Sequence, residues 1–173
     1  AQFMLVAAMN PCPCGNYGSR ITPCRCTAQQ IQRYRNRISG PMLDRIDIHV
    51  EMGEVGYNDI AGRSCGEPSS AIRARVNAAR AIQTRRYAGM GILFNAQLTN
   101  RMMNQYCVLT SDAEALMKKA FAALKLSARA YTRLLKVSRT IADLAGSEQI
   151  KAEHIAEAIQ YRSLESKYWG EIK

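Results

Sequence analysis

The hydrophobic pattern divides the chain into two parts with different periods. Residues 3–8 are continuously apolar, which is typical of a strand covered on both faces inside a parallel sheet. Residues 46–52 alternate strictly between apolar and polar positions, as in a strand at the edge of a sheet. Beyond Pro68 the apolar spacing is helical. The pattern therefore predicts an α/β part followed by an all-α part.

The segment between the two strands is predicted to hold a loop and two short helices. Residues 10–26 contain three prolines and four cysteines and are expected to form a loop. Thr27 is expected to cap a helix over residues 28–38, and Pro41 is expected to open a short helical turn. Since two strands alone do not make a stable sheet, we expect the missing strands upstream of Ala1, in a longer protein.

The second part is predicted to be a helical bundle. A short helix is expected over residues 99–106, Ser111 with Glu114 has the spacing of a capping box, and Gly146 is expected to end a helix. The apolar stripes of the longer helices are Ile72, Val76, Ala79 and Ile82; Leu116, Met117, Ala120, Phe121 and Leu124; Leu134, Val137, Ile141 and Leu144; and Ile155, Ala158 and Ile159. The expected domains are an α/β part with a cysteine-rich loop (1–52), a linker (53–67) and a helical domain (68–173).

The net charge indicates a class of partner, and the lack of long apolar runs argues against a membrane protein. The net charge of +10 arises from 24 Lys and Arg against 14 Asp and Glu, which favours nucleic acid or nucleotide phosphates as partners. A basic surface that only keeps the protein soluble would give the same balance. Because no apolar run approaches the ~20 residues of a membrane span and no secretory signal is recognisable, we expect a cytoplasmic protein with reduced cysteines.

Three polar residues stand where nucleotide chemistry would need them. Asn10 follows the first predicted strand, at the sheet edge where α/β proteins bind ligands, although Asn-Pro alone also starts ordinary turns. Arg45 precedes the edge strand, from which a guanidinium could reach the phosphates of a neighbouring subunit; pairing with Asp44 or Asp47 is the simpler alternative. Arg129 begins a helix whose basic face suits either phosphate or solvent.

The order of these segments resembles the latter half of an AAA+ ATPase. More narrowly, residues 10–15 (Asn-Pro-Cys-Pro-Cys-Gly), 24–26 (Cys-Arg-Cys) and 37–47 (Arg-Ile-Ser-Gly-Pro-Met-Leu-Asp-Arg-Ile-Asp) resemble the magnesium-chelatase-like family, and within it the competence-protein branch. The resemblance covers essentially the whole chain. It implies the C-terminal part of a P-loop ATPase module, with the last strands of its parallel sheet, followed by a helical lid.

The resemblance also implies roles for these three residues. Asn10 corresponds to sensor 1, Arg45 to an arginine finger that acts in trans, and Arg129 to sensor 2, which contacts an ATP phosphate. ATP with Mg²⁺ and assembly into a hexameric ring are implied for the full-length protein. The chain has no G-x-x-x-x-G-K-[ST] phosphate loop and no acidic strand end for Mg²⁺, so it is not expected to hydrolyse ATP by itself.

Four closely spaced cysteines suggest a metal site. Cys12, Cys14, Cys24 and Cys26 could supply four thiolates to a tetrahedral, structural Zn²⁺. Free thiols, or a disulfide formed in handling, remain the alternatives. Cys65 and Cys107 are isolated and are expected to be a loop and a core cysteine.

Arginines gather beside the cysteine loop, with tyrosines among them. This composition suits a nucleic-acid backbone, and we assign DNA contacts to Arg20, Arg25, Arg33, Arg35 and Arg37. A second arginine group at 73–86 equally suits a solvated helix face.

Three functions follow, in order of preference. The first is a ring-forming branch-migration motor that couples ATP hydrolysis to work on single-stranded or branched DNA. The second is the ATPase subunit of a chelatase that inserts Mg²⁺ into a porphyrin. The third is a zinc-stabilised nucleic-acid-binding module without ATPase chemistry.

Overall fold

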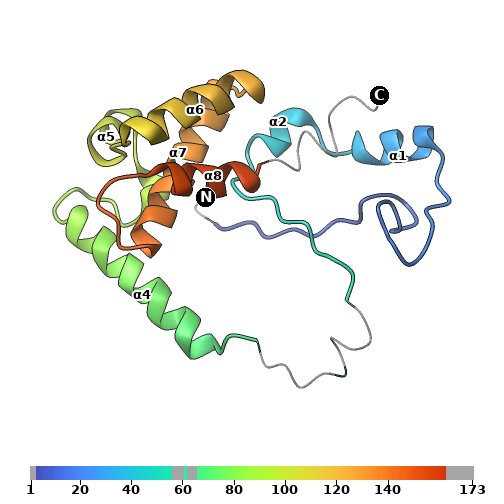
Figure 1. The fold of residues 1–173 in the computed structure, drawn as a ribbon, viewed down its shortest axis with the longest axis horizontal. Helices are drawn as coiled ribbons and strands as arrows, with labels where there is room; N and C mark the ends of the chain where they lie inside the picture. The colour runs from blue at the N-terminus through green and yellow to red at the C-terminus, as the bar shows by residue number, and fades with distance from the viewer. Residues whose placement is uncertain (1–2, 56–60, 62–65, 163–173) are drawn as a thin grey trace.

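The computed structural model describes residues 3–55, 61 and 66–162, and within them all regular secondary structure is helical (Figure 1). In chain order the elements are α1 (Ala28–Arg35), α2 (Gly40–Leu43), α4 (Ser69–Arg86), the 3₁₀ helix η1 (Asn95–Gln97), α5 (Asn100–Tyr106), α6 (Ser111–Ala123), α7 (Ala128–Leu144) and α8 (Ala152–Gln160). The predicted all-α second part is therefore confirmed.

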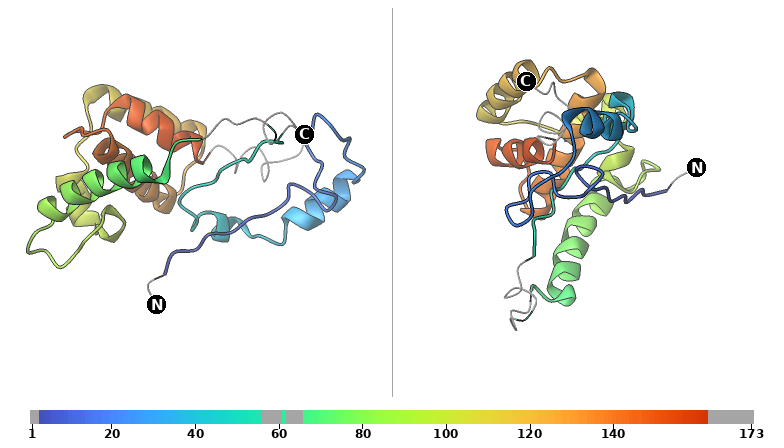
Figure 2. Two further views of the ribbon diagram at one scale, coloured as in Figure 1. Left: turned by 90° about the horizontal axis from the view of Figure 1, so that it is seen from below. Right: turned by 90° about the vertical axis from the view of Figure 1, so that its right-hand side faces the viewer.

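The bundle is built around α7. This helix packs against α4, η1, α5 and α8, and α6 covers α8 (Figure 2). Its buried positions include Leu134 and Ile141 of the predicted apolar stripe and also Leu135, whereas Leu144 of that stripe is 42% exposed. A parallel bridge between Leu109 and Ile150 ties together the loops that precede α6 and α8. Among the described residues, no helix combines the length and apolar character needed to cross a membrane.

Local sequence signals set most helix ends. Thr27 caps α1 as predicted, and its hydroxyl accepts from the backbone N–H of Gln30. Gly146 has a positive φ of 66° and follows the end of α7, where Ser147 N–H donates to the carbonyl of Ala142 at 2.8 Å. A left-handed residue at this position is what glycine tolerates best, so this prediction is confirmed.

The predicted capping box of α6 is wrong by one residue. Thr110, with an extended backbone, is the N-cap, and its hydroxyl accepts from Ala113 N–H at 3.4 Å. Ser111 already lies inside the helix, and Glu114 pairs instead with Lys118, one turn along at 2.9 Å. Adjacent Thr and Ser are both good caps, so local pattern alone does not choose between them.

The apolar stripe of α4 is buried over only half of the helix. Ala79 is 4% exposed and packs against the bundle, whereas Ile72 and Val76 are 41% and 43% exposed. Figure 1 shows the reason, since the first turns of α4 extend beyond the other helices. Helical spacing identified the face that the helix buries but not where burial stops.

The predicted strands do not form a sheet within the described residues. Residues 3–8 run without regular secondary structure, and Met4 and Val6 are 87% and 83% exposed. Residues 46–52 likewise do not form a strand. A strand needs a neighbour for its backbone hydrogen bonds, and this part of the chain provides none, so the α/β sheet stays a prediction. Most of the predicted linker, at 56–60 and 62–65, lies outside the described residues.

A buried carboxylate joins the helices of the bundle. The side chain of Asp143 is fully buried and accepts two hydrogen bonds from Arg86, at 2.9 and 2.5 Å. It also accepts from Arg139 at 3.1 Å and from the amide of Asn95 at 2.8 Å. Tyr87 donates to the same Asn95 side chain at 2.6 Å. One anion thus connects α4, η1 and α7.

The two arginines of this network differ in their surroundings. Burial opposes the charge of Arg86, but its bonds with Asp143 prevail and raise its pKa. Arg139 is 1% exposed, and burial lowers its pKa. Its remaining N–H groups donate to the carbonyls of Glu148 and Ser147, at 2.6 and 2.5 Å. The buried charges are therefore paired and hydrogen-bonded, as burial requires.

Replacing Asp143 with alanine is expected to destabilise the chain by about 3–5 kcal/mol, because it leaves two arginines buried without their anion. Urea unfolding followed by circular dichroism measures the change. The matched control is Glu114→Ala, which removes an exposed ion pair worth at most about 1 kcal/mol. Equal losses for the two variants would contradict the central role of Asp143.

Candidate functional site

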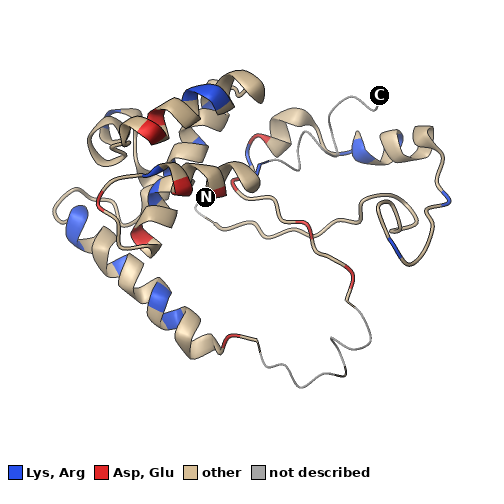
Figure 3. Cartoon of the chain, in the orientation of Figure 1, with Lys and Arg blue, Asp and Glu red and all other residues tan. Residues whose placement is uncertain are grey.

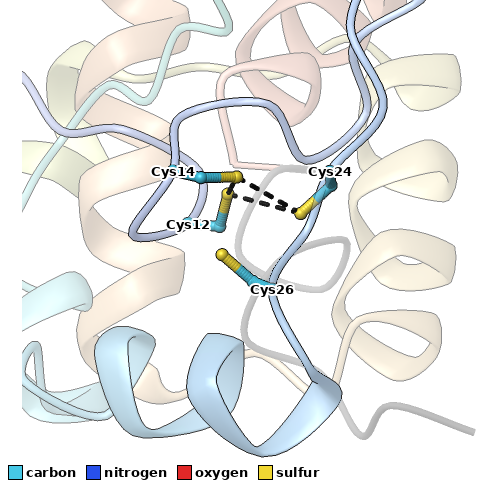
Figure 4. A group of neighbouring side chains, drawn as sticks. All are labelled: Cys12, Cys14, Cys24 and Cys26. Carbon is cyan, nitrogen blue, oxygen red and sulfur yellow. Dashed lines mark hydrogen bonds between the residues drawn. The ribbon is translucent and has the colours of Figure 1, made fainter.

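The four cysteines of the N-terminal loop lie together (Figure 4). The sulfur of Cys12 is 3.4 Å from that of Cys14 and 3.7 Å from that of Cys24, and Cys14 and Cys24 are 3.6 Å apart. With Cys26, all four sulfurs lie within 4.8 Å of one another. A turn closed by a hydrogen bond from Gly15 N–H to the Cys12 carbonyl folds the first pair back toward the second.

This geometry fits a tetrahedral thiolate site. Zn–S bonds of about 2.3 Å place the sulfurs about 3.8 Å apart at the corners of a tetrahedron, close to the separations seen here. The donor set contains only thiols, which select zinc over hard cations such as Mg²⁺. With four ligands from the protein, no position stays open for a reacting water, so the site suits a structural metal.

The protonation of these thiols shows what a cation would change. Hydrogen bonds from the backbone of Asn16 and Arg25, together with one from Cys12, lower the pKa of Cys14 to about 6. Burial and the neighbouring thiols raise the pKa of Cys26 to about 12. At neutral pH without a metal, Cys14 is therefore a thiolate and Cys26 is not. A divalent cation would compensate the charge that keeps the cluster from ionising fully.

Helix α1 is fixed to the cysteine loop by Arg35. This residue is 2% exposed. Its Nε donates to the carbonyl of Pro11 at 3.4 Å, and its guanidinium lies 4.6 Å from the centre of the Tyr17 ring. Arg35 was predicted to contact DNA, but its burial suits this internal role. We call the cysteine loop and α1 together, residues 10–37, the cysteine-loop unit.

The other four arginines of the unit are exposed. Arg33 lies on α1 and Arg37 lies in the turn just beyond its end, and both line a shallow depression whose remaining members are Gln29, Gln32 and Asn36. Spacings of three and four residues place Gln29, Gln32 and Arg33 on neighbouring positions of the helix surface. Arg20 lies in the loop, and Arg25 lies between two of the cysteines.

Arginines of the second group are engaged within the chain, although basic residues recur along α4 (Figure 3). Arg75 forms a 2.6 Å ion pair with Glu67, and the guanidinium of Arg80 lies 3.8 Å from the centre of the Phe94 ring. Arg86 belongs to the buried network described above. These three arginines therefore have partners within the chain, and Arg86 does not belong to the solvated helix face that was the alternative.

The three predicted nucleotide-sensing residues are exposed. Asn10 lies beside the cysteine loop, where a methyl group added to Gly15 would be 3.7 Å from its amide nitrogen. Arg45 follows α2, and its Nη1 donates to the carbonyl of Pro41 at 2.6 Å. Arg129 lies in the first turn of α7, as predicted. The three side chains do not contact one another, but the segments of Arg45 and Arg129 are joined through their neighbours Asp44 and Ser127.

The family comparison agrees with the motifs. The family described as magnesium chelatase, subunit ChlI, matches residues 1–60, and that described as magnesium chelatase, subunit ChlI C-terminal, matches residues 66–162. The chain belongs to the magnesium chelatase ChlI family. The family resemblance predicted from the motifs is thereby confirmed.

Individual relatives place the chain more narrowly. It is 44% identical to competence protein ComM of Haemophilus influenzae over 165 residues, which cover 95% of the chain and 31% of the relative. It is 42% identical to protein YifB of Salmonella typhimurium over 166 residues, and 33% identical to protein Rv2897c of Mycobacterium tuberculosis over 162 residues. The chain spans about a third of the length of these curated relatives.

In this member of the ChlI family, the acids beside Arg45 do not pair with it. Asp44 accepts from Ser127 Oγ and from Arg162, each at 3.2 Å. Asp47 pairs with Arg133, one turn after Arg129 on α7. The structure therefore contradicts the alternative that Arg45 forms a surface ion pair with Asp44 or Asp47.

Sequence reasoning missed Asp44 and Arg162 as members of this region. They are separated by 118 positions in the chain, and no local pattern links them. Lys136 lies two turns after Arg129 on α7, and its Nζ donates to the carbonyl of Ala96 at 2.9 Å. Burial lowers the pKa of Lys136, which is consistent with an internal contact.

Proposed function

We propose that the chain is the C-terminal portion of an AAA+ ATPase that couples ATP hydrolysis to work on DNA, in the manner of a ring-forming branch-migration helicase. Membership of the ChlI family supports the ATPase. Similarity over 95% of the chain to a protein named for competence supports the link to DNA. The observation that carries the choice of DNA is the cysteine-loop unit, which presents exposed arginines on a metal-ready scaffold.

The nucleotide would bind between subunits of the full-length protein. A phosphate loop upstream of Ala1 would hold it together with Mg²⁺. Asn10, as sensor 1, would orient the attacking water, because an amide offers both a donor and an acceptor. Arg129, as sensor 2, would contact a phosphate in its own subunit. Arg45 would enter the neighbouring site and neutralise the charge that develops on the γ-phosphate. A chain without the phosphate loop would hydrolyse no ATP.

Replacing Arg45 with alanine is expected to lower the ATPase rate of the full-length protein by about a thousandfold, the scale of an arginine finger. Branched DNA is expected to stimulate hydrolysis by the wild type. A coupled assay for released phosphate, with and without DNA at low salt, measures both effects. Arg101→Ala, which removes an exposed arginine of α5, is the matched control.

The same assay separates DNA work from chelation. If hydrolysis depends on Arg45 but ignores DNA, the ATPase stands and the chelatase alternative, with a porphyrin as substrate, replaces the DNA motor. If hydrolysis does not depend on Arg45, the proposed finger is wrong. A zinc-stabilised binding module without ATPase chemistry would bind DNA and hydrolyse nothing.

We propose that DNA phosphates contact Arg33 on α1 and Arg37 just beyond its C-terminal end, together with Arg20 and Arg25 of the loop. This helix has no acidic residue, and the amides that flank the arginines add neutral donors. A backbone contact carries no sequence preference, which suits a motor that moves along DNA.

Replacing Arg33 and Arg37 together is expected to weaken DNA binding about equally for unrelated sequences. Each lost phosphate contact should reduce the slope of log K against log salt by about 0.7–0.9. Fluorescence anisotropy with labelled single-stranded DNA, across a salt series, measures this slope. An unchanged slope in the double variant, with Arg101→Ala as the reference, would remove α1 from the interface.

We propose that Zn²⁺ occupies the four-cysteine cluster and stiffens the loop that carries Arg20 and Arg25. Metal analysis is expected to find one zinc per chain, and Co²⁺ is expected to give the visible absorption of a tetrahedral thiolate centre. Cys14→Ser should abolish both signals and weaken DNA binding, whereas Cys107→Ala, in the bundle core, should preserve the metal. A metal-free wild type with an intact DNA affinity would contradict this role.

A further inference from the structure

The turn that carries Arg45 is attached to the helical bundle as well as to its own segment, where the backbone N–H of Arg45 donates to the carbonyl of Met42 at 3.0 Å. Asp44, directly before Arg45, accepts from Ser127 at the N-terminus of α7 and from Arg162 beyond the end of α8. Arg162 also donates to the carbonyl of Ile46 at 3.2 Å, on the other side of Arg45. The residues on both sides of Arg45 are thus attached to the bundle, Asp44 through its carboxylate and Ile46 through its backbone carbonyl.

A third attachment follows shortly afterwards. The backbone N–H of His49 donates to the carbonyl of Tyr161 at 2.8 Å. Residues 44–49 therefore lie along the end of α8 and beside the start of α7. We call these contacts between residues 44–49 and the bundle the joint. The end of α7 that takes part in the joint also carries Arg129, two residues after Ser127.

The contacts of this joint differ in their exposure to solvent. Arg162 is 3% exposed in its side chain and Asp44 is 26% exposed. The nearby pair of Arg133 with Asp47 is wetter, with 27% and 58% of the side chains exposed. Ion pairs screened by water contribute little, whereas removing one partner of a buried pair leaves an uncompensated charge. Asp44 is therefore the acid on which the joint depends.

Ser127 connects this joint to the helix itself. Its Oγ accepts from the backbone N–H of Ala130 at 3.1 Å, which makes it the N-cap of α7, and it donates its own proton to Asp44. One hydroxyl thus caps the N-terminus of the helix that carries Arg129 and also holds the turn that carries Arg45. A shift of the first turn of α7 would be passed to Asp44 through this bond.

We propose that Asp44 is a positioning residue that couples the lid to the arginine finger: through Ser127 and Arg162 it makes the Arg45 turn move with the start of α7. The inference rests on the proposed function, since it takes Arg129 as the contact to a subunit's own nucleotide and Arg45 as the contact to the neighbour's nucleotide. Nucleotide binding in one site of the ring would then set the position of the finger in the next.

The first test measures ATP hydrolysis and nucleotide affinity of the full-length protein separately. Asp44→Ala is expected to lower kcat at least tenfold while the affinity for a fluorescent ATP analogue changes less than about twofold, because Asp44 touches no nucleotide of its own subunit. Asp47→Ala, which removes the wetter pair, is expected to lower kcat less than about threefold. Wild-type kcat in Asp44→Ala would overturn the proposal.

The decisive test mixes two inactive variants in one ring. Subunits with Asp44→Ala keep their own nucleotide pocket but present a misplaced finger, whereas subunits with a substituted phosphate loop keep a correct finger. Mixing them is expected to restore hydrolysis at those interfaces where a phosphate-loop variant inserts its Arg45 into the nucleotide pocket of an Asp44→Ala subunit. No restoration would overturn the proposal, because it would mean that Asp44→Ala damages its own subunit.

A second variant guards against misfolding of the first. Ser127→Gly removes the hydroxyl that bonds Asp44 but costs the N-cap only a few tenths of a kcal/mol, and it is expected to show the same loss of kcat and the same restoration on mixing, to a smaller degree. Retained kcat in Ser127→Gly would overturn the role of the hydroxyl. Failure of the proposed function would be seen in a separate experiment, because Arg45→Ala subunits would then still hydrolyse ATP.

Discussion

The helical part of this chain depends on the charge of one buried carboxylate. Asp143 accepts from Arg86 on α4, Asn95 on η1 and Arg139 on its own helix, so three elements converge on a single anion. Because breaking such a pair leaves buried charge uncompensated, the elements cannot separate individually at low cost. The network therefore holds α4, η1 and α7 together near the C-terminal end of α7, whose opposite end carries Arg129.

The N-terminal part is held by different forces. Its buried apolar side chains are few, namely Cys12, Ile31 and Leu43, and so small a core contributes little stability. What fixes the cysteine-loop unit instead is the Arg35 contact to Pro11 and Tyr17, together with the clustered thiols. A metal at the cluster would add the cross-link that the small core lacks, and it would leave the outer face of α1 unobstructed.

The sequence predicted those features that local rules decide. The helices, the Thr27 cap and the Gly146 terminus depend on residues within one or two turns, and the cysteine cluster depends on spacings of two to fourteen residues. The choice of Thr110 over Ser111 as a cap was not predictable from pattern, because both residues suit the position. The Asp143 network and the Asp44–Arg162 pair join residues 57 and 118 positions apart, and only the tertiary fold brings them together. The strands, which need neighbours, remain predictions.

The placement of charge around Arg45 accounts for how the proposed finger could leave its own segment although it lies between two acids. If Asp44 or Asp47 paired with it, release to a phosphate would require breaking an ion pair first. Both acids are instead occupied by cations and a hydroxyl of the helical bundle, and Arg45 itself donates to one backbone carbonyl. This exposed bond joins a charged donor to a neutral carbonyl, so exchanging the carbonyl for an anionic phosphate oxygen adds the attraction of opposite charges. The same contacts that fix the turn thus leave its guanidinium available.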